Sequence, residues 1–474
     1  QTNDEIRTGA GDDQIIFGNE SGYDAIDGGL GNDNLSLHWN TAGTTYLTVQ
    51  KSDSSWVNVG SGLDEIKANL ADAIAFNYSS NGYGYYDELG NYQNHAGSGV
   101  TYQGIESLTL ESGAYDDTLI YQNNQINRYA GNGGTDTFYA DLSGWTQGIH
   151  WVNDGSEQTF SNGVEGFTIS GIERLLVQTG SGDDVIEQKI AQTNDEIRTG
   201  AGDDQIIFGS ESGSDAVDGG LGNDTLTLNW NTAGTTYLTV QRADSSWVFV
   251  GSSLDEIKAN LADAIAFNYS SNGYGYYDEL GNYQNHAGSG VTYQGIESLT
   301  LESGAYDDTL IYQNNQINRY AGNGGTDTFY ADVSDWTVGL HWVNDGSEQT
   351  FSNGVEGFSV SGVERLLVQT GSGDDVIEQK IAQTNDEIRT GAGDDQIIFG
   401  NESGYDAIDG GLGNDNLSLH WNTAGTTYLT VQKSDSSWVN VGSGLDEIKA
   451  NLADAIAFNY SSNGYGYYDE LGNY

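Results

Sequence analysis

Internal repetition constrains this chain more than any other feature. The heptapeptide QTNDEIR begins at residues 1, 192 and 383, so the period is 191 residues. Copy one (1–191) and copy two (192–382) differ at 17 of 191 positions, and residues 383–474 repeat residues 1–92 without a change. Near-identical units stack so that each contacts mainly its neighbours. We therefore expect two full copies, 1–191 and 192–382, and a partial third copy, 383–474.

A shorter repeat runs through each copy. An acidic residue is followed two places later by an apolar one at Asp184, Asp195, Asp204, Asp215 and Asp224, with spacings of 11, 9, 11 and 9. Alternate members are 20 residues apart, which indicates a two-sided spiral of about 20 residues per coil with turns on both edges. The apolar side chains of the short strands would point inward. We expect an all-β fold, a parallel β-roll or β-helix solenoid.

Glycine-rich turns form one edge of this predicted spiral. They read GSGDD at 180–184, GAGDD at 200–204 and GLGND at 220–224. Glycine suits such turns because they need positive φ and close approach of backbone carbonyls. The pattern places rolls at about 1–36, 178–227 and 369–418. Second rolls with a degraded glycine pattern are expected at about 112–139 and 303–330.

Two longer excursions separate the rolls, and each returns through an Ile-Glu-x-Leu strand. Alternation in 45–50 and 55–59 predicts inserted β strands. Leu63, Ile66, Leu70 and Ile74 at helical spacing predict one short helix per repeat, with Ser61 as its N-cap and Asp64 three residues later.

The turns resemble the Gly-Gly-x-Gly-x-Asp-x-apolar-x nonapeptide of the RTX, or haemolysin-type calcium-binding, family, including large repetitive bacterial surface proteins. The resemblance implies several Ca²⁺ per repeat, type I secretion from a Gram-negative-type bacterium and an extracellular or cell-surface location. The implied aspartate ligands are Asp13, Asp33, Asp184, Asp204, Asp224, Asp375, Asp395 and Asp415. The implied turn glycines are Gly9, Gly11, Gly29, Gly31, Gly180, Gly182, Gly200, Gly202, Gly220, Gly222, Gly371, Gly373, Gly391, Gly393, Gly411 and Gly413. Aspartates that depart from the glycine pattern are Asp4, Asp24, Asp117, Asp136, Asp195, Asp215, Asp308, Asp327, Asp386 and Asp406.

Charge and ligand chemistry also favour calcium. The chain has 69 Asp and Glu against 15 Lys and Arg, a net charge of −54, and no cysteine. Such self-repulsion opposes compaction unless cations offset it, and these turns offer the oxygen ligands that calcium takes. The alternative is that the aspartates only cap turns. The same negative charge argues against nucleic acid as a partner, and the absence of an 18-residue apolar run argues against membrane insertion.

A tyrosine-rich stretch at 76–87 recurs in copy two, and its composition is that of recognition loops. It is a candidate contact surface for packing or for glycans. The tyrosines concerned are Tyr78, Tyr83, Tyr85, Tyr86, Tyr92, Tyr269, Tyr274, Tyr276, Tyr277 and Tyr283.

No catalytic constellation is expected, so the chain is predicted not to be an enzyme. His38 becomes Asn229 in copy two, and pairs such as Asp12 and Asp13 belong to the turns. Ice binding would need a regular Thr or Asn ladder that the turns do not carry. The expected function is a calcium-stabilised extracellular filament or matrix fibre that associates end to end or side by side. The alternatives are the extender stalk of a giant RTX adhesin and a carbohydrate-binding array.

Overall fold

The computed structural model describes most of the chain. The described residues are 3–18, 22–39, 43–86, 92–122, 126–191, 193–209, 213–230, 234–277, 283–286, 288–313, 317–381, 384–400, 404–421 and 426–462. Contacts divide the chain into two compact units. Unit 1 contains Gln1–Asp327 and Gly354–Gly362, and unit 2 contains Thr328–Asn353 and Val363–Tyr474. Each unit is described by itself.

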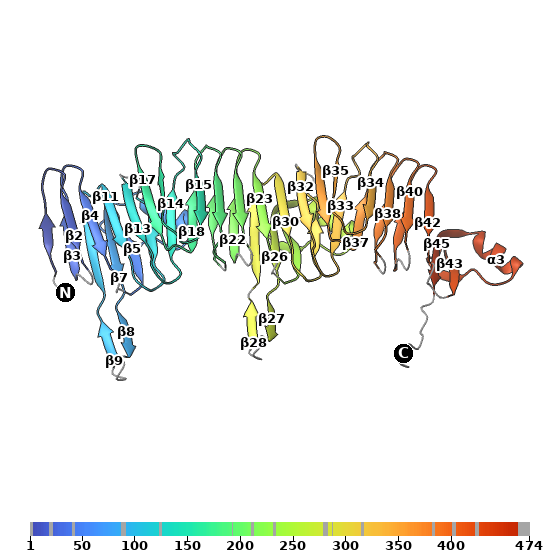
Figure 1. Ribbon diagram of the computed structural model, residues 1–474, viewed down its shortest axis with the longest axis horizontal. Coiled ribbons are helices and arrows are strands. Elements are labelled where there is room, and N and C mark those ends of the chain that lie inside the picture. Colours follow the sequence, from blue (N-terminus) through green and yellow to red (C-terminus); the bar gives the residue numbers. More distant parts are fainter. Residues whose placement is uncertain are drawn as a thin grey trace. The chain divides into compact units, whose positions relative to one another are not determined.

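Unit 1 consists almost entirely of strands (Figure 1). Its helices are α1 (Leu63–Leu70) and α2 (Leu254–Leu261). Its strands are β1 (Glu5–Arg7), β2 (Gln14–Phe17), β3 (Tyr23–Asp27), β4 (Asn34–His38), β5 (Thr45–Gln50), β6 (Trp56–Asn58), β7 (Ala75–Ser80), β8 (Tyr83–Tyr86), β9 (Tyr92–His95), β10 (Ser98–Gln103), β11 (Ser107–Glu111), β12 (Thr118–Ile120), β13 (Ile126–Ala130), β14 (Thr137–Asp141), β15 (His150–Asn153), β16 (Gln158–Ser161), β17 (Gly166–Ser170), β18 (Arg174–Gln178), β19 (Val185–Gln188), β20 (Glu196–Arg198), β21 (Gln205–Phe208), β22 (Ser214–Asp218), β23 (Thr225–Asn229), β24 (Thr236–Arg242), β25 (Trp247–Phe249), β26 (Ala264–Ser271), β27 (Tyr274–Tyr277), β28 (Tyr283–His286), β29 (Ser289–Gln294), β30 (Ser298–Glu302), β31 (Thr309–Ile311), β32 (Ile317–Ala321) and β36 (Gly357–Ser361).

Unit 2 also consists mainly of strands, and α3 is its helix among the described residues. It contains α3 (Leu445–Leu452), β33 (Thr328–Asp332), β34 (His341–Asn344), β35 (Gln349–Ser352), β37 (Arg365–Gln369), β38 (Val376–Gln379), β39 (Glu387–Arg389), β40 (Gln396–Phe399), β41 (Ala407–Asp409), β42 (Asn416–Leu419), β43 (Thr427–Lys433), β44 (Trp438–Asn440) and β45 (Ala455–Ser462). The mostly β character of both units confirms the predicted all-β class.

Strands pair in parallel at the predicted 20-residue spacing. In unit 1, Ile186 of β19 pairs with Ile206 of β21, which pairs with Leu226 of β23. On the other edge, Ile197 of β20 pairs with Val217 of β22. These side chains point inward and are buried, as expected from the alternation of side chains along a strand. The hydrophobic spacing in the sequence therefore sets the strand register.

The sheets are mixed rather than purely parallel. Strand β10 pairs in parallel with β3 and antiparallel with β7, and β5 pairs antiparallel with both β6 and β7. The predicted strand at 45–50 is present as β5, and the one predicted at 55–59 is the shorter β6. No sheet formed by the described strands closes on itself. The excursions thus continue the sheets of the parallel segments as antiparallel extensions.

The predicted short helix is present, but its boundaries differ from the prediction. The N-cap is Gly62 instead of Ser61, and no side chain caps the helix. Instead, Glu65 Oε2 accepts a hydrogen bond from the backbone N–H of Ser61 at 3.1 Å. Leu63 and Ile66 are buried, whereas Ile74 lies beyond the helix and its side chain is 54% exposed. The prediction for Ile74 was wrong because helix α1 ends four residues earlier.

Helix α1 of copy one makes hydrogen bonds to the first strand of copy two. The guanidinium of Arg198 in β20 donates to both carboxylate oxygens of Asp64, at 2.6 and 2.9 Å. The backbone N–H of Leu63 donates to Glu196 at 3.0 Å, and Lys67 forms an ion pair with Asp141 of β14 at 3.0 Å. A helix of copy one is therefore bonded to the first strand of copy two.

Aromatic side chains fill the interior of unit 1 around residues 138–167. In unit 1, the ring of Phe138 lies 5.1 Å from that of Phe167 and 6.1 Å from that of Trp151, and Phe160 lies 4.9 Å from Trp151. All four side chains are buried. Large buried aromatic surface is a main source of stability, and it supplies a core to a chain that has no disulfide.

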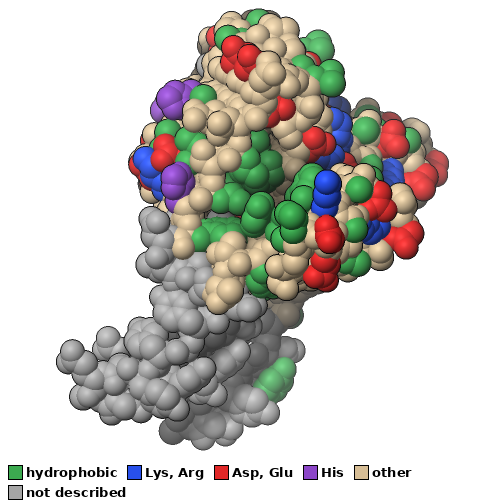
Figure 2. Space-filling model, turned by 90° about the vertical axis from the view of Figure 1, so that its right-hand side faces the viewer, with side chains coloured by type: hydrophobic (Ala, Val, Ile, Leu, Met, Phe, Trp, Pro, Cys, Tyr) green, Lys and Arg blue, Asp and Glu red, His purple; other side chains and the backbone are tan. Residues whose placement is uncertain are grey.

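Hydrophobic side chains gather on the face of unit 2 that carries α3 (Figure 2). Leu445 is 82% exposed and Tyr460 is 54% exposed, while their counterparts Leu63 and Tyr78 in copy one are fully buried. In unit 1, strand β10 pairs with β7, the strand that carries Tyr78, and β14 contacts α1. These strands have no counterpart among the described residues after 383.

Among the helices of the described chain, none is long and apolar enough to cross a membrane.

Candidate metal centre in the glycine-rich turns

Consecutive glycine-rich turns lie in close contact. Gly220 and Gly222 have φ of +89° and +146°, which other residues rarely adopt. A Cβ atom at Gly222 would lie 1.8 Å from the carbonyl oxygen of Gly202, one coil earlier. Between the two glycines, the N–H of Leu221 donates to the carbonyl of Gly200 at 2.9 Å. Glycine is therefore required here for both backbone conformation and space.

The predicted ligands form a ladder of aspartates. Asp204 Oδ1 accepts a hydrogen bond from the backbone N–H of Asp184 at 2.7 Å, and Asp224 Oδ1 accepts one from the N–H of Asp204 at 2.9 Å. The same bond links Asp13 to Asp33 at 2.9 Å. In unit 2 it links Asp375 to Asp395 at 2.8 Å and Asp395 to Asp415 at 3.2 Å. One oxygen of each accepting carboxylate is thus engaged with the neighbouring coil.

The second carboxylate oxygen has no hydrogen-bond donor in most members of the ladder. The residues whose buried Oδ2 lacks a partner are Asp13, Asp33, Asp184, Asp204, Asp224 and Asp395. Buried polar atoms are almost always hydrogen-bonded, and an isolated buried carboxylate is costly. A row of such oxygens at one coil spacing is the pattern expected if a cation supplies the missing partner.

The unpaired oxygen points into its own turn. At Gly219, a Cβ atom would meet Asp224 Oδ2 at 2.8 Å and the carbonyl oxygen of Gly295 at 2.0 Å. At Gly28, it would likewise meet Asp33 Oδ2 at 2.7 Å and the carbonyl oxygen of Gly104 at 2.0 Å. Carboxylate and carbonyl oxygens therefore converge beside a residue without a side chain. Oxygen donors of these two kinds fit calcium.

Burial makes the charged form of these aspartates costly. Desolvation raises the pKa of Asp184 and of Asp224 to about 6, and it raises the pKa of Asp204 as well. Neighbouring carboxylates add to the shift, since the charges of Asp203 and Asp204 raise the pKa of Asp224 further. A divalent cation would reverse this effect because an opposite charge favours the carboxylate.

No group of three or more His, Cys, Asp or Glu side chains converges on a possible ion position among the described residues. A cation in these turns would instead take a carboxylate oxygen together with backbone carbonyls.

On the opposite edge, Asp195 and Asp386 are bonded differently from the aspartates of the ladder. Asp195 Oδ1 accepts the N–H of Leu175 at 2.6 Å, and its Oδ2 accepts the Thr193 hydroxyl at 2.6 Å and the Gln188 amide at 3.0 Å. Asp386 makes the equivalent three bonds in unit 2. Both carboxylates are satisfied by protein groups alone.

Other aspartates of this edge accept a backbone N–H from the preceding coil. The backbone N–H of Asp4 donates to Asp24, that of Asp195 donates to Asp215, and that of Asp386 donates to Asp406, at 2.8 to 2.9 Å. Asp24 Oδ2 is buried without a partner.

The segments at 112–139 and 303–330 repeat the ladder at a spacing of 19. Asp136 Oδ1 accepts the N–H of Asp117 at 2.8 Å, as Asp327 accepts that of Asp308. Asp117 is bonded further by the N–H groups of Thr45 and Gly113. Asp136 Oδ2 is buried without a partner, and burial raises the pKa of Asp136 to about 8.

Three glutamates end these ladders, and their role was not predicted. The last aspartate of each ladder donates its backbone N–H to one of these glutamates at 2.8 to 2.9 Å. The pairs are Asp33 with Glu106, Asp136 with Glu173 and Asp224 with Glu297. The glutamates belong to the Ile-Glu-x-Leu segments. The recurrence of a glutamate at every return strand was the signal in the sequence.

The tyrosine-rich candidate surface is only partly described. Tyr78 and Tyr269 are fully buried, and each hydroxyl accepts a backbone N–H at 2.9 Å, from Ile120 and Ile311. These two rings pack in the interior, which is the packing alternative considered for the stretch, and they are not exposed to an outside partner. Tyr92 is 62% exposed. The side chains of Tyr83, Tyr85, Tyr86, Tyr274, Tyr276, Tyr277 and Tyr283 lie outside the described residues.

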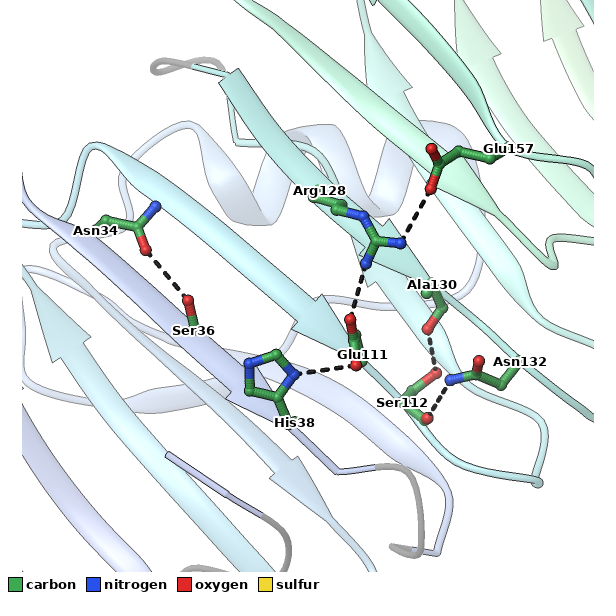
Figure 3. Close-up of polar contacts among 9 residues, drawn as sticks. All are labelled: Asn34, Ser36, His38, Glu111, Ser112, Arg128, Ala130, Asn132 and Glu157. Atoms are coloured by element: carbon green, nitrogen blue, oxygen red, sulfur yellow. Dashed lines mark hydrogen bonds and ion pairs between the residues drawn. The ribbon is translucent and has the colours of Figure 1, made fainter. Parts of the chain in front are cut away.

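A polar network lies on the outer face of copy one (Figure 3). Glu111 accepts from Arg128 at 2.8 Å and contacts His38 Nδ1 at 3.0 Å, and Arg128 also bonds Glu157 at 3.0 Å. The hydrogen bond with His38 lowers the pKa of Glu111 most. Copy two keeps the Glu–Arg pair, as Glu302 and Arg319 at 2.5 Å, but has asparagine in place of the histidine. This is a surface ion-pair row.

Comparison with known proteins adds no assignment. No family model matches the chain, and no curated protein matches its sequence.

Proposed function

We propose that this chain is a calcium-stabilised, repetitive extracellular structural protein that forms a filament or matrix fibre around bacterial cells. Its parallel segments would be β-rolls whose glycine-rich edge binds calcium. The observation that carries the proposal is the row of buried, unpaired Oδ2 atoms at Asp184, Asp204 and Asp224. Asp184 belongs to copy one and the other two to copy two, so the row continues across the copy boundary.

Calcium fits this row better than other common cations. The available ligands are carboxylate and carbonyl oxygens, without thiol or imidazole, which favours a hard cation. Calcium accepts irregular shells of 6 to 8 oxygens, whereas magnesium requires near-octahedral geometry. Binding would also offset part of the net charge of −54 and would lower the cost of burying several carboxylates along one edge.

A structural role is supported by how the copies differ. The turn residues are the same in copies one and two, whereas His38 of the polar surface network is replaced by Asn229. Stacked coils bonded across the copy boundary transmit stiffness along the chain because each coil contacts its neighbours. A filament built from such copies, secreted by a type I route, is the function that these features support best.

The test is calcium dependence of the fold. Unfolding of the full chain should be followed by circular dichroism in calcium, in magnesium and in chelator. We expect a large drop in melting temperature on chelation, which calcium reverses and magnesium does not. Elemental analysis of dialysed protein should find several calcium ions per 191-residue copy. An unchanged melting temperature in chelator would contradict the proposal.

Electron microscopy of the calcium-loaded chain separates a filament from an adhesin stalk. Association between chains, end to end or side by side, supports the filament. Isolated single-chain rods at all concentrations would favour the stalk.

A further inference from the structure

A polar groove lies on the outer face of unit 1, away from the glycine-rich turns. Its volume is about 520 Å³. Strands β20, β22 and β29 contribute Glu196, Ser214, Gly290 and Thr292, and Tyr237 and Asn268 come from β24 and β26. Volumes of this size suit small-molecule ligands. The lining residues belong to copy two, except Arg174, which lies in β18 near the end of copy one.

At one position that lines the groove, copy two has a serine where copies one and three have a tyrosine. Ser214 corresponds to Tyr23 and Tyr405. In copy one, the Cδ1 atom of the Tyr23 ring is 3.4 Å from the position that a Cβ would take on Gly99, so the ring lies over that glycine. Gly290, the counterpart of Gly99, has no such ring above it. The substitution vacates the space of one six-membered ring.

The groove offers both hydrogen-bond donors and hydrogen-bond acceptors. Arg174 and Glu196 lie 3.8 Å apart, and Asp195 and Asp215 also line the groove, so its acidic groups disfavour an anionic ligand. Asn268 Oδ1 accepts the Ser270 hydroxyl at 2.9 Å, which orients the amide. Thr292 alternates along β29 with the buried Val291 and Tyr293, so its side chain lies on the groove face of the strand. A neutral ligand that carries many hydroxyl groups could pair with these donors and acceptors.

An aromatic pair stands beside these polar groups. The Tyr237 ring is 6.4 Å from that of Phe249, which is 50% exposed. Phe249 replaces Asn58 of copy one, so a second difference between the copies adds an aromatic ring next to the groove. Exposed aromatic faces next to polar groups are suited to ligands with both apolar and polar surface, as in a pyranose ring.

We propose that this groove binds a neutral saccharide, one site per copy of the second type. The ring would occupy the space over Gly290 that Tyr23 fills in copy one, next to Tyr237. Arg174, Asn268 and the Thr292 hydroxyl would bond the sugar hydroxyls. Asn268 belongs to 267–278, the copy-two counterpart of the tyrosine-rich stretch, but none of the tyrosines predicted as a contact surface lines the groove. Asp195 and Asp215 at the groove belong to the edge opposite the glycine-rich turns.

The test uses Ser214→Tyr in the full chain, in calcium-containing buffer. Tyrosine is already tolerated at this position in copy one beside the same neighbours, so the variant should fold and melt like the wild type. Binding of cellohexaose, maltohexaose and chitohexaose should be measured by isothermal titration calorimetry. We expect at least one of these sugars to bind the wild type and to bind Ser214→Tyr at least about tenfold more weakly.

Two further variants sharpen the result. Asn268→Ala removes a polar partner without filling the groove and should also weaken binding about tenfold. Ala243→Ser converts another exposed position of copy two to the residue of copy one, outside the groove, and should bind like the wild type. Equal binding by wild type and Ser214→Tyr would overturn the proposal, as would no binding of any of the three sugars to the folded wild type. Either result leaves the calcium test unaffected, because that test reads the stability of the fold.

Discussion

Two rows of Asp-x-apolar steps run through residues 178–227 of unit 1, and they differ in how Asp204 and Asp195 are bonded. On the glycine-rich edge, Asp204 has one oxygen bonded to Asp184, 20 residues earlier, and one buried oxygen without a donor. On the opposite edge, Asp195 accepts three hydrogen bonds from Leu175, Thr193 and Gln188. Asp195 thus meets its bonding requirement within the protein, whereas Asp204, like Asp24 on the opposite edge, keeps a buried oxygen without a donor.

This difference has an energetic meaning. A buried charge must be compensated by hydrogen bonds or by an opposite charge. Thr193 and Gln188 provide the first kind of compensation at Asp195, whereas at Asp204 the neighbouring Thr199 hydroxyl donates to the carbonyl of Gly219 at 2.9 Å. We therefore expect the stability contribution of Asp204 to depend on calcium and that of Asp195 not to, and the following changes test that expectation.

The largest effect is expected from Gly222→Ala. The new Cβ would overlap the Gly202 carbonyl oxygen, and alanine would have to adopt φ of +146°. We expect the free energy of unfolding to fall by about 3–5 kcal/mol, measured by urea denaturation in calcium. Leu221→Ala is the matched control, since Leu221 is 75% exposed, and it should change stability by less than about 0.5 kcal/mol. Equal effects of the two changes would mean that the turns are not closely stacked.

Asp204→Asn should have effects of opposite sign with and without calcium. Asparagine keeps the acceptor for the Asp184 N–H but removes the charge. In calcium we expect a loss of about 2.7 kcal/mol, which corresponds to a hundredfold weaker site. In chelator the variant should be as stable as the wild type or more stable, because a costly buried charge is gone. Thermal melts in both buffers measure this, and destabilisation by the same amount in both would rule out a metal at Asp204.

Asp195→Asn should be destabilising by a similar amount in both buffers. The asparagine amide cannot accept from both the Thr193 hydroxyl and the Gln188 amide, so a buried donor loses its partner. We expect a loss of about 1–3 kcal/mol. Comparing melts of this variant with and without calcium checks the prediction. A calcium-dependent loss would place an ion on this edge as well.

The smallest effect is expected from pH in the absence of calcium. The folded pKa values of Asp184 and Asp136, about 6 and about 8, lie above the ordinary value of 3.8. The folded chain therefore holds more protons than the unfolded chain between about pH 4 and 8. Stability in chelator should fall by about 1–3 kcal/mol as pH rises through this window. In calcium the fall should vanish or reverse, because calcium binds the carboxylate form, and denaturation at several pH values tests both.

Much of the architecture was predictable from spacing. The 20-residue separation of Asp184, Asp204 and Asp224 matched the register of parallel pairing, because residues at the same point of successive coils lie side by side. The strand at 45–50 followed from its alternation. The prediction of a helix was right, but that of its end was wrong, since Ile74 keeps the helical spacing without belonging to the helix.

The candidate site was only half predictable. The Gly-x-Gly-x-Asp pattern identified the ladder. That Asp195 is satisfied by Thr193 and Gln188 could not be inferred, because which side chains meet across a turn depends on how the coils pack. The same holds for Tyr78: its composition left packing and ligand contact open, and only the tertiary structure places its ring in the interior beside Ile120.

The sequence by itself determined the period, the coil length, the strand register and the positions of the turns. These are local or periodic properties, set by where glycine, aspartate and inward-facing apolar residues recur. Only the tertiary structure decided which carboxylate oxygens lack a donor, where a groove opens over Gly290 and how α1 bonds copy two through Asp64 and Arg198. These features depend on contacts between residues far apart in the chain, and such contacts leave no period in the sequence.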